Sequence, residues 1–256
     1  SLFSLWLLGT VIFKHAWLSV IPVVIFSFEK LFVDQLRYAP LLDIIQLPFI
    51  LLCLYFFVKE LKTKRFIFTG LSLGLVMATK TIVPGLLLLL TFVLFFLLKR
   101  RTKMIMYLAF YFPLSLLVFF LSYTRTFLSG YTFWDFVGFQ KWIFLYQKSK
   151  LLFPFSAWRL VFLNQWQAWW GDMSILKADD WQVTWPLFTG STMLAGILVV
   201  LKKIPESPAI TILLLWSLVY AAFLSLGVIS SRFLLPFLPV TFIVGIYLLK
   251  ESKKIL

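Results

Sequence analysis

Three ionisable residues, Asp43, Lys80 and Arg232, stand where apolar segments of the sequence begin or end. Asp43 opens the apolar segment that follows Arg37, Lys80 follows the Gly-containing segment 70–79, and Arg232 precedes a Pro-containing segment. A carboxylate can serve as a general base, and ammonium and guanidinium groups bind phosphate oxygens. The three residue types together predict a site for a phosphorylated lipid at a membrane surface.

Each residue could also have a purely structural role. A carboxylate in the first turn of a helix complements the helix dipole, and a lysine or arginine at a helix end anchors it at the interface. Asp43 alone fits the functional and the structural role equally well, and Lys80 alone favours anchoring. The three residues at one predicted face, under an aromatic-rich loop, favour a shared site.

Other catalytic motifs are missing from the sequence. It contains no phosphate-binding loop of the G-x-x-x-x-G-K-[ST] type, no G-x-S-x-G and no H-E-x-x-H. The single His15 excludes a histidine-based metal site or triad within these 256 residues, and the single Cys53 excludes an intramolecular disulfide.

The composition predicts an all-α integral membrane protein. Hydrophobic residues make up 62% of the chain and charged residues 13%, with a mean hydropathy of +0.98, so a soluble polar shell cannot be built. Nine apolar segments predict a multi-span helical bundle, in which 1–13 and 16–28 are doubtful as full spans. The segments are 1–13, 16–28, 41–58, 66–79, 82–98, 104–122, 186–201, 209–226 and 233–249.

The charge pattern predicts the topology. The net charge is +14, and the basic residues cluster in short connections, which favours topology signals and anionic-lipid contacts over nucleic-acid binding. If all nine segments cross, fourteen basic residues in short connections fall on one side, which the positive-inside rule makes cytoplasmic. They are Lys14, Lys59, Lys62, Lys64, Arg65, Lys99, Arg100, Arg101, Lys103, Lys202, Lys203, Lys250, Lys253 and Lys254. Asp43, Lys80 and Arg232 then lie on the non-cytoplasmic side.

The segment 123–185 is the one long extramembrane stretch, and it holds eight of the eleven tryptophans. Tryptophan favours the headgroup layer, so we expect non-cytoplasmic interfacial helices at about 133–147 and 156–170. Gly70 and Gly74, four residues apart, predict a close helix contact. Internal prolines at 48, 84, 113, 236 and 239 predict kinked helices whose freed carbonyls need partners. We expect residues 1–256 to form a single domain.

The order Arg37…Asp43, then Gly70-Leu71-Ser72-Leu73-Gly74-Leu75…Lys80, then Arg232-Phe233-Leu234-Leu235-Pro236…Pro239 resembles the polytopic GT-C glycosyltransferases. The nearest type is the protein O-mannosyltransferases and aminoarabinose transferases. The resemblance extends from about residue 1 to 250. It implies that the chain lacks an N-terminal outer loop carrying an essential acidic residue, and that it is therefore N-terminally truncated.

The resemblance implies transfer of a sugar, mannose-like or another hexose or pentose, from a polyprenyl-phosphate donor. The acceptor is a protein, lipid or glycan on the non-cytoplasmic face of a bacterial or archaeal plasma membrane, or of the endoplasmic reticulum. Asp43 would be the catalytic carboxylate, and Arg37, Lys80 and Arg232 would bind substrate. A divalent metal ion takes part in some relatives, and the sequence gives no ligands for it.

The segment Gln165-Trp166-Gln167-Ala168-Trp169-Trp170-Gly171-Asp172 is similar to the Trp-Trp-Asp element of oligosaccharyltransferases, with a glycine intervening. Trp169, Trp170 and Asp172 are thus candidates for binding acceptor or sugar, although interfacial anchoring is the favoured role. Two other functions stay open: a lipid or solute transporter, and a non-catalytic membrane subunit. The absence of charged residues in mid-span and of internal repeats argues against the transporter.

Overall fold

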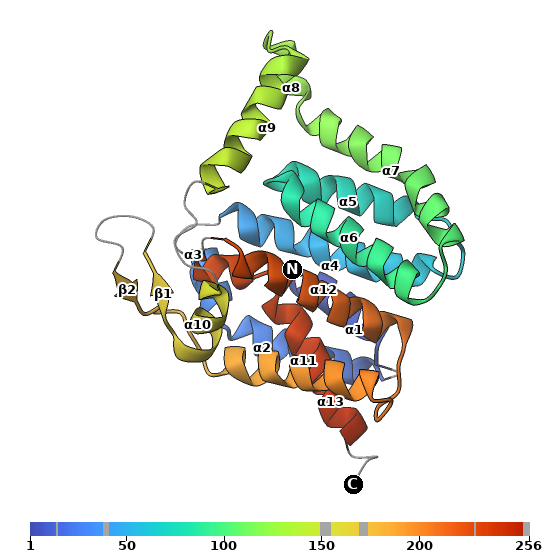
Figure 1. Cartoon of the computed structure of the whole chain (residues 1–256), viewed down its shortest axis with the longest axis vertical. Helices are drawn as coiled ribbons and strands as arrows, with labels where there is room; N and C mark the ends of the chain where they lie inside the picture. Colours follow the sequence, from blue (N-terminus) through green and yellow to red (C-terminus); the bar gives the residue numbers. More distant parts are fainter. Residues whose placement is uncertain (14, 38–40, 149–154, 169–173, 228, 253–256) are drawn as a thin grey trace.

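The computed structural model shows a chain folded almost entirely into helices, with one small β-hairpin (Figure 1). It describes residues 1–13, 15–37, 41–148, 155–168, 174–227 and 229–252. In these residues the elements are, in order, α1 (Leu2–Thr10), η1 (Ala16–Ser19), α2 (Val20–Ser27), α3 (Lys30–Arg37), α4 (Leu42–Glu60), α5 (Ile67–Thr79), α6 (Ile82–Leu98), α7 (Lys103–Ser122), α8 (Thr124–Leu128), α9 (Phe133–Lys148), α10 (Ser156–Leu163), β1 (Trp166–Gln167), β2 (Ile175–Leu176), α11 (Thr184–Val200), α12 (Pro208–Ser225), η2 (Ser231–Leu234) and α13 (Leu238–Ser252).

Each of the nine predicted apolar segments contains a helix, but the helices differ in length. Three of them, α4, α7 and α12, are long and apolar enough to cross a membrane. A fourth span results if the bent pair Ala16–Ser27 and Lys30–Arg37, which meet at 64°, counts as one crossing. Helices α5, α6 and α11 are apolar but shorter, and α1 has only nine residues. The described chain is therefore mostly helical, with three or four helices able to cross a membrane, while a bundle with nine complete crossings stays a prediction.

The helices pack in two groups that α12 joins. Figure 1 shows α4, α5, α6 and α7 in its upper half and α2, α11 and α13 in its lower half. Helix α4 also contacts α1, and α12 contacts α6, α4 and α13. The upper group is filled by phenylalanines from α4, α6 and the start of α5: the rings of Phe57 and Phe92 stack with centroids 3.8 Å apart, and Phe66 and Phe96 pack beside them. Aromatic stacking of this kind stabilises the group beyond simple burial.

The glycine pair in α5 makes the predicted close contact, and its partner is α7. A Cβ added at Gly74 would lie 2.7 Å from both the Ser115 carbonyl oxygen and Val118 Cβ. At Gly70 the added atom would lie 3.0 Å from the Tyr111 carbonyl oxygen. The backbones of α5 and α7 therefore approach one another at a distance that leaves no room for a side chain, as in small-residue contacts between membrane helices.

Three of the connections predicted to share one side, those after α6, before α12 and at the end of α13, meet at one end of the bundle. Lys99, after α6, forms an ion pair with Glu206, before α12. The Tyr247 hydroxyl, near the end of α13, donates to the Pro205 carbonyl at 2.6 Å. Glu60, at the end of α4, accepts hydrogen bonds from the Phe68 and Thr69 amides and so satisfies the free N–H groups that begin α5. The alternation of nine crossings that the charges predict stays a prediction.

Two turns at this end use a basic residue in the left-handed backbone conformation. Arg100, with φ of 52°, follows α6, and Lys202, with φ of 56°, follows α11. In both turns the next amide reaches back five residues, from Arg101 to the Phe96 carbonyl and from Lys203 to the Leu198 carbonyl, each at 2.8 Å. This is the Schellman pattern that satisfies the last carbonyls of a helix, normally with glycine at the left-handed position.

The tryptophan-rich segment 123–185 contains α8, α9, α10 and the β-hairpin. The prediction of a helix at 133–147 is confirmed by α9, whose outer surface carries Trp134 and Trp142 at 76% and 59% exposure. The prediction of a helix across 156–170 is wrong in length, because α10 ends at Leu163. Asn164 takes a left-handed conformation there, and Trp166–Gln167 continues as a strand that pairs with Ile175–Leu176.

Candidate functional site

Asp43 lies in the first turn of α4 and is 5% exposed. Leu41, in extended conformation, begins the helix without a side-chain cap, so the free amides of the first turn face a nearby carboxylate. Asp43 thus lies where a carboxylate complements the helix dipole. Asp43 also makes contacts beyond its own helix, because two cations approach the same carboxylate.

Lys80 reaches Asp43 because α4 and α5 form an antiparallel pair, which returns the chain to the start of α4. Lys80 directly follows α5, and the extended Thr81 starts α6 after it. The Lys80 Nζ donates a hydrogen bond to Asp43 Oδ1 and forms an ion pair with it. Burial lowers the pKa of Lys80 from its ordinary value, while the charge of Asp43 opposes that effect.

Arg232 approaches the other oxygen of the carboxylate from η2. Its Nε lies 3.9 Å from Asp43 Oδ2 and is buried without a hydrogen-bond partner in the described residues. The ring of Phe233 lies under both cations, with its centroid 4.8 Å from Lys80 Nζ and 5.2 Å from Arg232 Cζ. We call Asp43, Lys80, Arg232 and Phe233 the ion cluster. One carboxylate and two cations leave it with an excess of one positive charge.

Helix α12 holds the segment that carries Arg232. The Tyr220 hydroxyl donates to the Phe233 carbonyl at 3.1 Å, and Trp216 Nε1 donates to the Pro236 carbonyl at 3.0 Å. The residue three positions after each of these carbonyls is a proline, Pro236 or Pro239, which has no N–H to offer. The predicted need for partners is therefore met at these two carbonyls. No helix is kinked at Pro84, Pro236 or Pro239, because Pro84 and Pro239 lie in the first turns of α6 and α13 and Pro236 precedes α13. Pro48 and Pro113 do lie inside helices, α4 and α7, where kinks stay a prediction.

The structure brings together three of the residues predicted from the sequence and leaves others apart. Arg37 is the exposed last residue of α3, and within the described residues no ion pair or hydrogen bond joins it to the ion cluster. Trp169, Trp170 and Asp172 lie outside the described residues. No group of three or more His, Cys, Asp or Glu among the described residues is placed to hold a metal ion.

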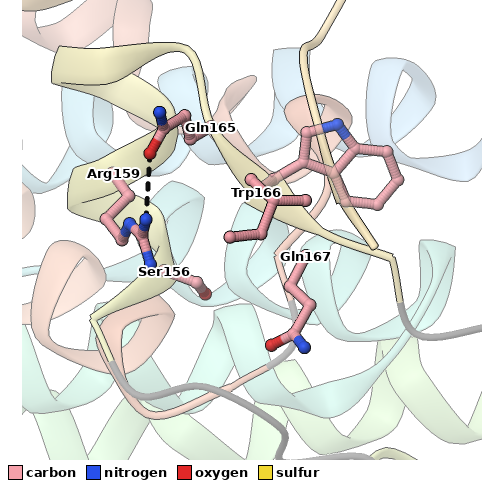
Figure 2. A pocket seen from close by; sticks show the side chains of 6 residues that line it. Ser156, Arg159, Gln165, Trp166 and Gln167 are labelled. Atoms are coloured by element: carbon pink, nitrogen blue, oxygen red, sulfur yellow. Dashed lines mark hydrogen bonds between the residues drawn. The ribbon is translucent and has the colours of Figure 1, made fainter. Parts of the chain in front are cut away.

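A second feature is a small open cavity at the junction of α10 and the β-hairpin, which we call the α10 pocket (Figure 2). Its volume is about 90 Å³, and it is lined by Ser156, Arg159, Gln165, Trp166, Gln167 and Ile175. Arg159 Nη2 donates to Gln165 Oε1 at 2.9 Å along one wall, and the Trp166 and Gln167 side chains lie across from that pair in Figure 2. The pocket combines one indole with several hydrogen-bonding groups.

Sequence reasoning missed the α10 pocket and the role of Phe233. The signal for the pocket was Asn164, a residue that commonly ends a helix in the left-handed conformation, followed by a short polar and aromatic run. For Phe233 the signal was its position next to Arg232, but aromatic residues are common at membrane surfaces, where most of them only anchor the chain.

The fold and the ion cluster together define a helical protein with three or four helices able to cross a membrane and a charged site at one end of the bundle. No protein-family model matches the chain, and no curated protein or solved structure is significantly similar to it.

Proposed function

We propose that this protein is a membrane glycosyltransferase that moves a sugar from a polyprenyl-phosphate donor to an acceptor on the non-cytoplasmic face. The observation that carries the proposal is the convergence of Asp43, Lys80 and Arg232, from three separate parts of the chain, on a single site. Placing charged residues in an apolar bundle costs free energy. Three such residues therefore meet only where they neutralise one another or bind a ligand.

The chemistry of the ion cluster suits this reaction. The acceptor hydroxyl attacks the anomeric carbon, its proton passes to the Asp43 carboxylate, and the bond from that carbon to the lipid phosphate breaks. The phosphate leaves as an anion and needs little protonation, but its charge needs a counterion. Lys80 and Arg232 supply two cations for one resident carboxylate, so the excess charge is of the right sign.

Arg232 is the better candidate for the first contact with phosphate. Its Nε is buried without a hydrogen-bond partner in the described residues, and its side chain as a whole is 32% exposed. A guanidinium binds two phosphate oxygens at once. Lys80, held by Asp43, would shift toward the phosphate only when substrate arrives, which would release the carboxylate to accept the proton.

The test is a transfer assay on the full chain in nanodiscs, with a radiolabelled polyprenyl-phosphate hexose as donor and a panel of peptide, lipid and glycan acceptors. We expect Asp43→Asn to reduce turnover by about 10² or more, and Arg232→Ala to raise the KM for the donor. Lys99→Ala is the matched control, because it breaks an ion pair of the same type at the opposite end of the bundle.

The outcomes separate the proposal from its alternatives. Undiminished turnover in both Asp43→Asn and Lys80→Ala would remove these residues from the reaction. A protein that transfers no sugar but moves the labelled lipid between leaflets would be a flippase. A protein that does neither, and in which Asp43→Asn has no effect, would be a non-catalytic subunit.

A further inference from the structure

We propose that Gln46 is a positioning residue for the ion cluster: its side chain fixes the end of α5, so that Lys80 meets Asp43. The consequence for sugar transfer rests on the proposed function, whereas the effect of Gln46 on the ion pair does not. Gln46 lies in α4 and is 1% exposed. Its Nε2 donates a hydrogen bond to the Val76 carbonyl of α5 at 2.7 Å.

The Val76 carbonyl is the first of the four carbonyls that end α5. In a continuing helix it would accept from the amide of Lys80, four residues further along the chain. The backbone leaves the helix at Lys80, with φ of −140° and ψ of −72°, and among the described residues no amide of the turn after α5 bonds to this carbonyl. The Gln46 amide therefore replaces the missing donor and satisfies a buried acceptor.

This hydrogen bond lies one turn deeper in the bundle than the ion pair. Gln46 follows Asp43 by three residues, which puts both side chains on one face of α4, about 4.5 Å apart along the helix axis. Val76 precedes Lys80 by four residues at the end of α5, the helix that packs along α4. One face of α4 therefore holds the end of α5 twice, by the backbone of Val76 and by the charge of Lys80.

A hydrogen bond at this position does what an apolar contact cannot do. The neighbouring Ile44, Leu47 and Ile50 of α4 are buried in the core. A buried amide is unfavourable unless it is hydrogen-bonded, and a hydrogen bond tolerates only a narrow range of distances and angles. The bond from Gln46 therefore sets the position along α4 at which α5 ends.

Gln46 holds the chain that carries Lys80 much as Tyr220 holds the chain that carries Arg232. Tyr220 acts on the Phe233 carbonyl, and Gln46 acts on the backbone one turn before Lys80. In the proposed reaction, a phosphate would then displace the cationic side chains and not the backbones that carry them. Lys80 Nζ, 4.8 Å from the centre of the Phe233 ring, could move across that ring. Charges positioned in advance need no rearrangement of the chain when the substrate reacts.

The test asks whether the strength of the pair between Asp43 and Lys80 depends on Gln46. Gln46→Met keeps the length of the side chain and removes its donor. Cys53→Ala is the matched control, because Cys53 is buried in the same helix and its Sγ lies 3.8 Å from another α5 carbonyl, that of Thr69. In the parent and in each of these backgrounds, reversible unfolding of the full chain in mixed micelles is measured for Asp43→Asn, Lys80→Met and the double variant.

The coupling factor is the ratio by which the unfolding constant of the double variant departs from the product expected from the two single variants. We expect a coupling factor of about five to thirty in the parent and in Cys53→Ala, and of about three or less in Gln46→Met. Both background changes should lower stability, so the coupling factor separates positioning from a general loss of packing. An unchanged coupling factor in Gln46→Met, or an equal drop in Cys53→Ala, would overturn the inference.

A second variant keeps the test decisive if Gln46→Met does not fold. Gln46→Asn retains the amide but is shorter by one methylene, which moves the donor away from the Val76 carbonyl. It should lower the coupling factor in the same way. A coupling factor equal to that of the parent in Gln46→Asn would count against the inference.

Failure of this inference and failure of the proposed function give different results. A coupling factor that depends on Gln46, in a protein that transfers no sugar, would uphold the positioning role and refute the transferase. Sugar transfer by the parent, with an unchanged coupling factor in Gln46→Met, would uphold the transferase and refute the positioning role. If both proposals hold, Gln46→Met should lower kcat about tenfold more than Cys53→Ala does, because the carboxylate and the ammonium group are no longer held in place.

Discussion

Replacing Lys80 by methionine should destabilise the protein, because the largely buried Asp43 carboxylate would lose its hydrogen-bonded partner and keep only Arg232 nearby. Removing one partner of a fully buried ion pair costs about 3–5 kcal/mol, while an exposed pair contributes about 0–1 kcal/mol. The side chains of Asp43 and Lys80 are 7% and 21% exposed, and Arg232 Nε remains 3.9 Å away. The loss should therefore lie between these limits, at about 2–3 kcal/mol.

The assay is reversible unfolding in mixed micelles, carried out for Lys80→Met, Asp43→Asn and the double variant. Because the double variant carries no unpaired charge from this pair, it should recover at least half of the loss, which gives a coupling energy of about 1–2 kcal/mol. Its transferase activity should not recover. Equal stability of Lys80→Met and the parent would refute the argument, since the ion pair would then contribute nothing measurable.

Three further predictions concern the scaffold. Gly74→Ala should be less stable than Gly190→Ala by about 1–3 kcal/mol in the same unfolding assay, because only the former meets backbone within 3 Å. Glu60→Gln should lose about 1–3 kcal/mol, since an amide nitrogen would face the donors that begin α5; an unchanged unfolding midpoint would contradict this. Hydrogen bonds from Thr132 lower the pKa of Asp135, so its support of α9 should exist above about pH 4 and disappear as the pH falls further. Faster amide exchange in α9 of Asp135→Asn than of the parent at pH 7, with a difference that shrinks as the pH is lowered below 4, would confirm it.

The helices could be predicted from the sequence because apolar segments and charged connections are unambiguous signals. The length of each helix could not be predicted from the sequence, because local backbone geometry decides where a helix ends. Asn164 ended α10 seven residues before the predicted end at 170, and the apolar segment predicted from 233 forms α13 only from Leu238, after Pro236. A breaker residue shows that an element changes, but whether it ends, kinks or starts a helix depends on which carbonyls neighbouring helices can satisfy.

The meeting of Asp43, Lys80 and Arg232 follows from topology, because alternating segments bring their ends to a common face. The individual contacts between these side chains could be identified only from the structure. Arg37, only six residues before Asp43, ends α3 at an exposed position, and Phe233 rather than a polar residue lies beneath both cations. Sequence spacing gives the end of the bundle at which a residue lies, whereas packing of the intervening helices decides which side chains touch.

Under the topology predicted from the charges, the basic left-handed turns at Arg100 and Lys202 would couple biogenesis to folding. Glycine would relieve the backbone strain at either position by about 1 kcal/mol, yet it would also remove a charge that the sequence pattern predicts to orient the chain in the membrane. Such a variant would fold into a more robust protein once inserted, while more of its copies would enter the membrane in the inverted orientation. Thermostability screens on purified material would therefore select substitutions that lower the yield of correctly inserted protein in cells.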